Sequence, residues 1–173
     1  MTDLLDVAML YRPTRRDIRG REVVNSERRT IDFFVNGISL FTATNAYRHD
    51  LCGCFSPDYV TSENELTRNE NQRIAKIFSF ESPTEIGRDR VALFICPQCG
   101  DLACGAITFQ LSRVGDTVRW SHFAHENGYD ETETDFDGYS AVGPFEFAFD
   151  GYREVIRSAS SSHRMISSLT QNR

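Results

Sequence analysis

Three of the five cysteines lie within nine residues, in the stretch Cys96-Pro97-Gln98-Cys99-Gly100-Asp101-Leu102-Ala103-Cys104-Gly105. An apolar run over residues 91–95 leads into this stretch, and residues 106–111 alternate between apolar and polar side chains after it. A continuous run of β-prone apolar residues predicts a buried strand, and alternation predicts a half-buried one. The cysteine stretch is therefore expected to be a corner of the fold where two core strands meet.

A third strand is expected to return beside the second. Gly115-Asp116 predicts a turn, after which residues 117–125 form the antiparallel partner. If the turn has two residues, Phe109 lies opposite His122 and Leu111 lies opposite Trp120. The expected core face is Ile107, Phe109, Leu111, Trp120, His122 and Ala124. The expected outer face is Thr108, Gln110, Arg119, Ser121, Phe123 and His125. A longer loop over residues 113–117 would shift this register.

Asn36-Gly37 predicts a separate hairpin between residues 30–35 and 38–42. This dipeptide supplies the positive φ angles of a type I′ turn, whose twist suits a two-residue hairpin. In that register Phe33 faces Leu40 and Val35 faces Ile38, which gives the hairpin a buried face.

Two further segments show helical signals. Leu66, Ile74, Ile77 and Phe78 are at helical spacing and predict a helix over about residues 63–79, with a capping box at Ser62 and a stop at Ser82-Pro83. Near the C-terminal end, residues 145–149 alternate as a strand with three phenylalanines on one face. Asp150 can then cap a short helix that carries Tyr152, Val155 and Ile156.

Together these segments predict an α+β fold, a mostly antiparallel sheet of hairpins covered by two or three short helices. Residues 1–29 are interpreted as an Arg-rich N-terminal arm or a short helix. Residues 30–157 are expected to form a single domain, and residues 158–173 a serine-rich flexible tail.

Composition restricts the class of protein. The 173 residues include 40% hydrophobic and 25% charged residues, as in a soluble globular protein. They contain neither a transmembrane run nor the basic and apolar start of a signal peptide, so we expect a cytoplasmic location and no membrane partner. The net charge of −6 argues against nucleic-acid binding. Oligomeric state stays open.

The spacing Cys96-x2-Cys99-x4-Cys104 is typical of a metal knuckle, with zinc as the candidate ion. Zinc needs a fourth ligand, and in the expected register His125 lies on the face of Cys104, one diagonal neighbour away. His122 is a weaker choice, and Cys52 and Cys54 are alternatives from a distant loop. Free buried thiols are another interpretation. A redox pair of Cys96 and Cys99 lacks the helix N-terminus that lowers a thiol pKa.

Acidic residues dominate the second half of the chain. Residues 121–154 contain nine acids and one arginine, without the residue order of a calcium loop. Clustered carboxylates attract basic partners and speed association. The candidate partner-binding residues are Glu126, Asp130, Glu131, Glu133, Asp135 and Asp137.

The second half also resembles a known family. The motifs are Cys96-x2-Cys99-Gly100-Asp101-x2-Cys104-Gly105, then Val118-x-Trp120-x2-Phe123-x2-Glu126-Asn127, then Gly143-Pro144-Phe145-x-Phe147-x2-Asp150 with Tyr152. Over residues 90–157 these motifs are similar to a family of small uncharacterised bacterial proteins, some labelled generically as oxidoreductases. The resemblance implies a bacterial cytosolic protein and assigns no catalytic residue.

Two functions are compatible with these features. The first is a non-enzymatic acidic binding protein, an immunity-type inhibitor that covers the basic active cleft of a bacterial toxin or enzyme. The second is a small zinc- or thiol-dependent enzyme centred on the three cysteines, with His125 as ligand or base. No Walker loop, GxSxG elbow, HExxH helix or dinucleotide fingerprint is present, which favours the binding protein.

Overall fold

The computed structural model describes residues 1–16, 23–56, 65–127 and 134–161. The strands are β1 (Leu5–Arg12), β2 (Arg15–Arg16), β3 (Val23–Asn25), β4 (Arg28–Val35), β5 (Ile38–Ser39), β6 (Cys52–Gly53), β7 (Arg90–Ile95), β8 (Ala106–Val114), β9 (Thr117–Glu126) and β10 (Phe145–Ala148). The helices are α1 (Leu40–Ala43), α3 (Glu65–Phe78) and α4 (Phe149–Ser160), with the 3-10 turns η1 (Ala46–His49), η2 (Leu102–Cys104) and η4 (Asp137–Tyr139).

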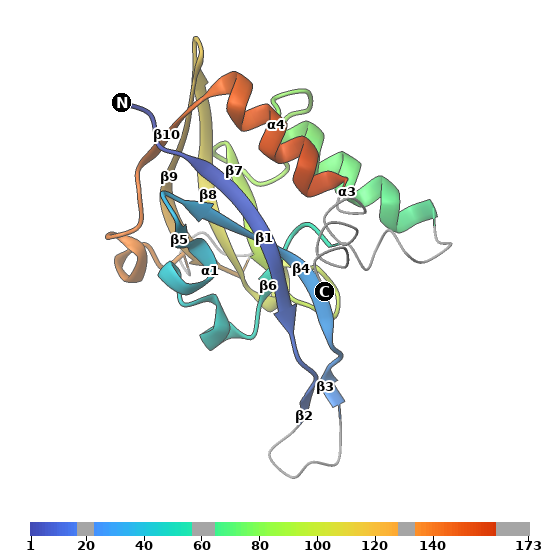
Figure 1. The fold of residues 1–173 in the computed structure, drawn as a ribbon. Coiled ribbons are helices and arrows are strands. Elements are labelled where there is room, and N and C mark those ends of the chain that lie inside the picture. The colour runs from blue at the N-terminus through green and yellow to red at the C-terminus, as the bar shows by residue number, and fades with distance from the viewer. Residues whose placement is uncertain (17–22, 57–64, 128–133, 162–173) are drawn as a thin grey trace.

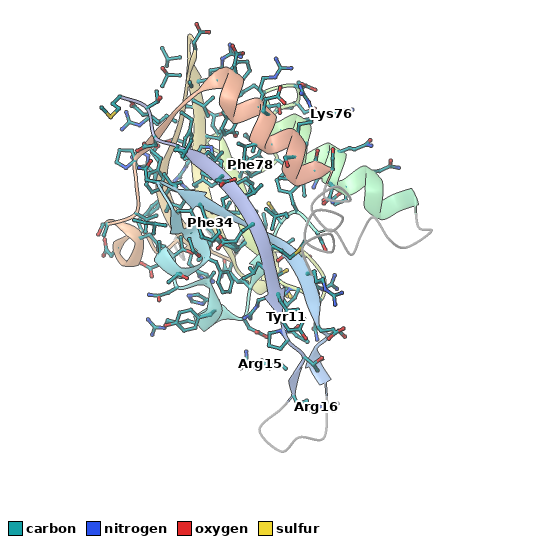
Figure 2. The ribbon with its side chains drawn as sticks, viewed as in Figure 1. Tyr11, Arg15, Arg16, Phe34, Lys76 and Phe78 are labelled. Carbon is teal, nitrogen blue, oxygen red and sulfur yellow. The ribbon has the colours of Figure 1, made fainter. Side chains whose placement is uncertain are left out.

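The fold is α+β with antiparallel pairing, as the sequence predicts. Five strands form one sheet in the order β10-β9-β8-β7-β6, and β1-β4-β5 form a second sheet. The short pair β2-β3 extends from one end of the molecule (Figure 1). α3 and α4 pack side by side along one flank, and Figure 2 shows Phe78 of α3 directed inward while Lys76 points to solvent.

Aromatic side chains join the two sheets and the two long helices. The ring of Trp120 on β9 lies 5.4 Å from Phe33 of β4, 4.3 Å from Phe109 of β8 and 5.8 Å from Phe78 of α3. The Trp120 indole N–H donates to the Tyr152 hydroxyl at 3.3 Å, and that hydroxyl donates to the Phe78 carbonyl at 3.0 Å. The buried polar atoms of this aromatic centre are therefore paired.

The N-terminal residues form a strand, which corrects the expectation of an arm or a short helix over residues 1–29. β1 pairs with β4 from Leu5 opposite Val35 to Arg12 opposite Arg28. Ile31 and Phe33 of β4 are buried in the core, so the backbone groups along the β1 side of β4 need partners. Pairing with β1 satisfies these groups, so this segment is extended and not helical.

The Asn36-Gly37 hairpin is confirmed, but its second strand is short. Both turn residues have positive φ angles, 51° and 81°, and Val35 pairs with Ile38 as expected. The chain then turns into α1, because the Ser39 hydroxyl accepts from the Thr42 N–H at 3.1 Å and caps the helix. Leu40 therefore reaches the core from a helix, and Ile38 is left exposed, which corrects the expected pairing of Phe33 with Leu40.

Both predicted helices are present. α3 covers Glu65–Phe78, within the expected residues 63–79, whereas its predicted cap at Ser62 lies outside the described residues. α4 begins at Phe149, which the alternating pattern of residues 145–149 predicts as part of the preceding strand. It continues to Ser160, so residues 158–160 of the expected tail are helical, and the tail from 162 lies outside the described residues.

The predicted β8–β9 register is correct near the turn, but the observed pairing differs from it farther along the strands. Leu111 pairs with Trp120 as predicted, but Gln110 pairs with Ser121 while Thr108 pairs with Ala124. Phe109 of β8 therefore lies opposite two residues of β9, His122 and Phe123, which is a β-bulge. The bulge leaves His122 exposed and places Phe123 in the core, where it stacks on Phe109 at 5.4 Å. It corrects the prediction that His122 faces the core and Phe123 the outside.

A candidate three-thiol metal site

The cysteine stretch forms a compact loop between β7 and β8. The Gly100 N–H donates to the Cys96 carbonyl at 3.0 Å, and the Asp101 carboxylate accepts from the Ala103 N–H at 2.9 Å and caps η2. Gly100 and Gly105 have positive φ angles of 67° and 89°, which side chains rarely adopt. These two turns fold the loop back on itself, so that its cysteines converge.

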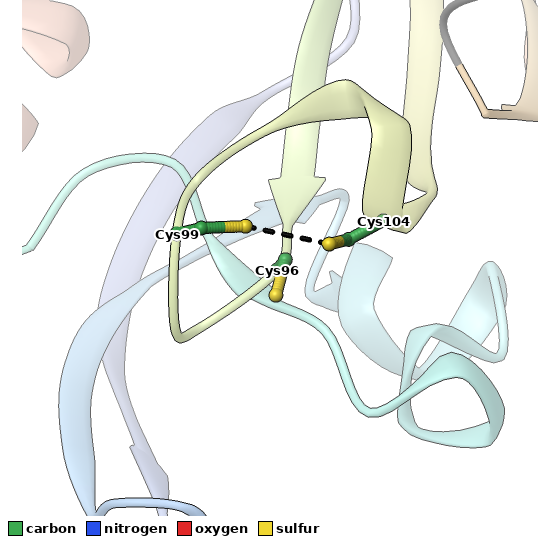
Figure 3. A group of neighbouring side chains, drawn as sticks. All are labelled: Cys96, Cys99 and Cys104. Carbon is green, nitrogen blue, oxygen red and sulfur yellow. Dashed lines mark hydrogen bonds between the residues drawn. The ribbon is translucent and has the colours of Figure 1, made fainter.

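The three thiol sulfurs lie within 4.8 Å of one another (Figure 3). The Cys99 and Cys104 sulfurs are 3.4 Å apart, well beyond a disulfide bond length, and all five cysteines of the chain are free. Cys99 and Cys104 are exposed, and Cys96 is half-buried. These three thiols can together hold a metal ion, as the sequence predicts for Cys96, Cys99 and Cys104.

Hydrogen bonds shift the pKa values of Cys96 and Cys104 in opposite directions. Burial raises the pKa of Cys96, but backbone N–H groups of Cys99 and Gln98, together with the other two thiols, outweigh burial and lower that pKa. At Cys104 the hydrogen bond with Cys99, followed by the charge of nearby Cys96, raises the pKa to about 11. Cys96 therefore loses its proton more easily than Cys104. A cation is needed to draw the proton from Cys104 at neutral pH.

His125 does not belong to the group of ligand atoms that lie within 4.8 Å of one another. On β9, His125 pairs with Ile107 of β8. Its Nε2 lies 2.7 Å from the position that a Cβ on Gly105 would occupy. Its ring stacks on His49 at 4.0 Å, and His49 Nε2 lies 3.4 Å from the Tyr139 hydroxyl. Burial, followed by the charge of His49, lowers the pKa of His125. His125 therefore lies beside the loop, stacked on His49.

The two remaining cysteines lie in the core. Cys52 pairs with Ile95 on β7, and burial raises the pKa of its thiol to about 12. Burial also raises the pKa of Cys54. These protonated, buried thiols pack as small apolar side chains, and neither joins the cluster of three.

The residues of the predicted acidic surface lie in different environments. Glu126 is buried and pairs with the guanidinium of Arg90, while the Thr108 hydroxyl donates to the Glu126 carboxylate at 2.5 Å. A paired carboxylate in the core is not available to a partner, so the assignment of Glu126 to a partner surface is wrong. Asp135 and Asp137 are exposed. Asp130, Glu131 and Glu133 lie outside the described residues.

Sequence reasoning missed two contributors, Arg90 and His49. Arg90 begins an apolar strand, and only the register of β7, β8 and β9 reveals that it meets Glu126. His49 lies on η1, far from His125 in the sequence, and no local pattern connects the two rings.

The comparisons with known proteins are negative. No family model, curated protein or solved structure matches this chain. Within the described residues no helix is long and apolar enough to cross a membrane.

Proposed function

We propose that this protein is a zinc-binding protein whose ion is held by Cys96, Cys99 and Cys104. The supporting observation is the convergence of the three sulfurs within 4.8 Å of one another. Tetrahedral zinc with Zn–S bonds of about 2.3 Å separates its thiolates by about 3.8 Å. The 3.4 Å between Cys99 and Cys104 is within a small side-chain adjustment of that value.

Thiolate chemistry selects the ion. Three sulfur donors suit zinc and other soft ions, whereas magnesium and calcium prefer oxygen ligands. The hydrogen bonds that lower the pKa of Cys96 also prepare one thiolate to bind the cation first. A metal bound here joins the end of β7 to the start of β8, so its primary role is to fix this corner.

The fourth coordination position separates a structural role from an enzymatic one. A structural zinc site is closed by four protein ligands, whereas a catalytic site leaves one position for water or substrate. If His125 turns toward the ion, the site is closed and structural. If water takes the position at the exposed side of Cys99 and Cys104, the site supports the zinc-dependent enzyme predicted as the alternative.

Elemental analysis of protein purified without chelator tests the proposal. About one zinc per chain is expected, because a three-thiolate site retains zinc tightly. Cys99→Ser should lose most of it, while the matched variant Cys54→Ala removes a thiol outside the cluster and should keep it. Wild-type protein with less than about 0.1 ion per chain would contradict the proposal, since such a site should not lose its zinc during purification.

An acidic binding protein of the immunity type is the second candidate. It is favoured by the net charge of −6 and by Phe136, which is 40% exposed between the exposed Asp135 and Asp137. An exposed aromatic ring flanked by carboxylates suits a basic protein surface, where aromatic anchors supply much of the binding energy.

Co-purification with the product of the adjacent gene tests this second function. A complex is expected that weakens when Asp135 and Asp137 are both changed to Asn, but not when Glu154→Gln removes an exposed acid on α4. Reproducible absence of a partner would count against it.

A further inference from the structure

The β-bulge of β9 presents His122 in an unusual conformation. Its φ angle is 52°, in the left-handed region that few residues other than glycine adopt. The Arg90 Nη1 group donates to the His122 carbonyl at 2.8 Å, and Arg90 is in turn held by Glu126 and Thr108. A buried ion pair therefore holds the bulge in place. Strained residues held by a rigid network occur preferentially at functional sites.

The bulge brings two polar side chains together. Successive side chains of a regular strand point to opposite faces, but here the His122 Nδ1 atom lies 3.0 Å from the Ser121 hydroxyl. Ser121 is 6% exposed, and His122 is exposed. Arg119 lies two residues before Ser121 on the same face of β9. Arg119 and the hydrogen-bonded pair of Ser121 and His122 thus supply hydrogen-bond donors on one side of β9.

These donors line a groove of about 310 Å³, a volume that suits a small organic molecule. Its other wall comes from residues 136–144, with Phe136, Val142 and Pro144 as apolar contacts. Gly143 allows the close approach, because a Cβ there would lie 3.2 Å from the Phe123 ring and 3.4 Å from the Trp120 carbonyl. The groove therefore combines a polar strand with an apolar wall.

We propose that this groove binds a small organic anion, a flat apolar body carrying a carboxylate or phosphate. The anionic oxygens would bind the Arg119 guanidinium and the His122 imidazole, whose Nε2–H is free to donate when the Ser121 hydroxyl donates to Nδ1. The flat body would lie against Phe136 and Pro144. This site is distinct from the three thiols and does not depend on the metal proposal.

The carboxylates of Glu146 and Asp137 both add negative charge near the groove. Glu146 lies 3.6 Å from Arg119, a distance at which the ion pair lacks a hydrogen bond, so the Arg119 donors are available to a ligand. Asp137 lines the groove as well and disfavours an anion placed next to it. The anionic group therefore belongs at the Arg119 end, with the apolar body toward Phe136.

Titration calorimetry with phenyl phosphate and benzoate tests the proposal on the full chain. Phenyl phosphate should bind measurably, and benzamidine, which has the same ring and a positive charge, should bind at least tenfold more weakly. Arg119→Ala should weaken phenyl phosphate binding about tenfold, since it removes a charge-assisted hydrogen bond. Arg157→Ala, which removes an exposed arginine on α4, should leave binding unchanged.

Two further variants separate binding from folding. His122→Gly keeps the left-handed backbone without strain, so it should fold and yet bind phenyl phosphate more weakly. Asp137→Asn removes a repulsive charge and should tighten binding. Equal binding of benzamidine and phenyl phosphate, or equal losses in Arg119→Ala and Arg157→Ala, would overturn the proposal.

Discussion

At the scale of single residues, the buried pair of Arg90 and Glu126 connects the core to the surface. Arg90 spans three strands by contacting Thr108 on β8, Glu126 on β9 and the carbonyl of His122 at the bulge. Burial lowers the pKa of Arg90, although the charge of Glu126 acts in the opposite direction. The ring of Phe136 lies 5.3 Å from its guanidinium. One side chain thus holds the sheet, the bulge and one wall of the groove together.

Glu126→Ala should lower the free energy of unfolding by about 3–5 kcal/mol, because it leaves the Arg90 charge buried without its partner. Denaturant unfolding monitored by circular dichroism measures this. The control is Glu154→Ala, which breaks an exposed ion pair with Arg157 and should change stability by less than about 1 kcal/mol. Similar losses in both variants would contradict the structural role of Glu126.

The stack of His49 and His125 predicts a pH effect on metal-free protein. The pKa of His125 is lowered below its ordinary value of 6.5 in the folded state. As the pH falls through 6.5, the unfolded chain therefore binds a proton before the folded chain does, and stability decreases. Stability of the wild type should fall between pH 7.5 and 5.5, and less so in His125→Phe. Urea unfolding with chelator present measures both slopes, and identical slopes would count against this explanation.

At the scale of elements, the two-residue strand β6 determines how the two sheets meet. β6 pairs with β7, while the Gly53 N–H donates to the Thr30 hydroxyl of β4 at 3.1 Å. The Ile31 N–H then donates to the Phe55 carbonyl at 2.9 Å. The segment from Cys52 to Phe55 therefore makes hydrogen bonds with strands of both sheets, and the Gly53 backbone lies directly against that of β4.

Gly53→Ala should destabilise the protein by about 1–3 kcal/mol or more, because overpacking forces backbone shifts. A Cβ on Gly53 would overlap the carbonyl oxygen of Ile31. Gly87→Ala is the matched control, since a Cβ there has no atom within 4 Å. Thermal unfolding of the two variants checks this, and a Gly53→Ala protein as stable as Gly87→Ala would show that the contact is relieved at little cost.

Local sequence signals predict the elements whose structure is determined by neighbouring residues in the sequence. Asn36-Gly37 specifies its own turn, and Leu111 pairs with Trp120 because the Gly115 turn is close by. The bulge at His122 could not be predicted, since it depends on Arg90 from another strand. β1 is also not predicted by local signals, because its extended conformation depends on pairing with β4, which is not adjacent to it in the sequence. At the thiol site, sequence spacing identified the three cysteines, whereas the position of His125 depended on the β8–β9 pairing beyond the turn.

At the scale of the whole molecule, the thiol loop lies at one end of the five-stranded sheet and closes the connection between two of its central strands. A ligand that binds only the folded state stabilises every element that unfolds with it. Metal bound at this loop would therefore stabilise every element that unfolds together with it.

Zinc should accordingly raise the melting temperature of protein first stripped with chelator. At free zinc about 1,000 times the dissociation constant, the gain is about 4 kcal/mol. For a chain of this length that corresponds to an increase of about 8–16 °C. Magnesium at the same concentration should give no increase, because it binds thiolates poorly. An equal increase in Cys96→Ser would place the zinc elsewhere.

The position of Trp120 also makes this residue an intrinsic fluorescence probe of folding. It is the only tryptophan in the sequence, and its indole contacts β4, β8, α3 and α4 at once. Intrinsic fluorescence excited selectively at this indole therefore comes from a single point, where both sheets and both long helices converge. Its emission will follow the docking of the helices onto the sheets, without any introduced label.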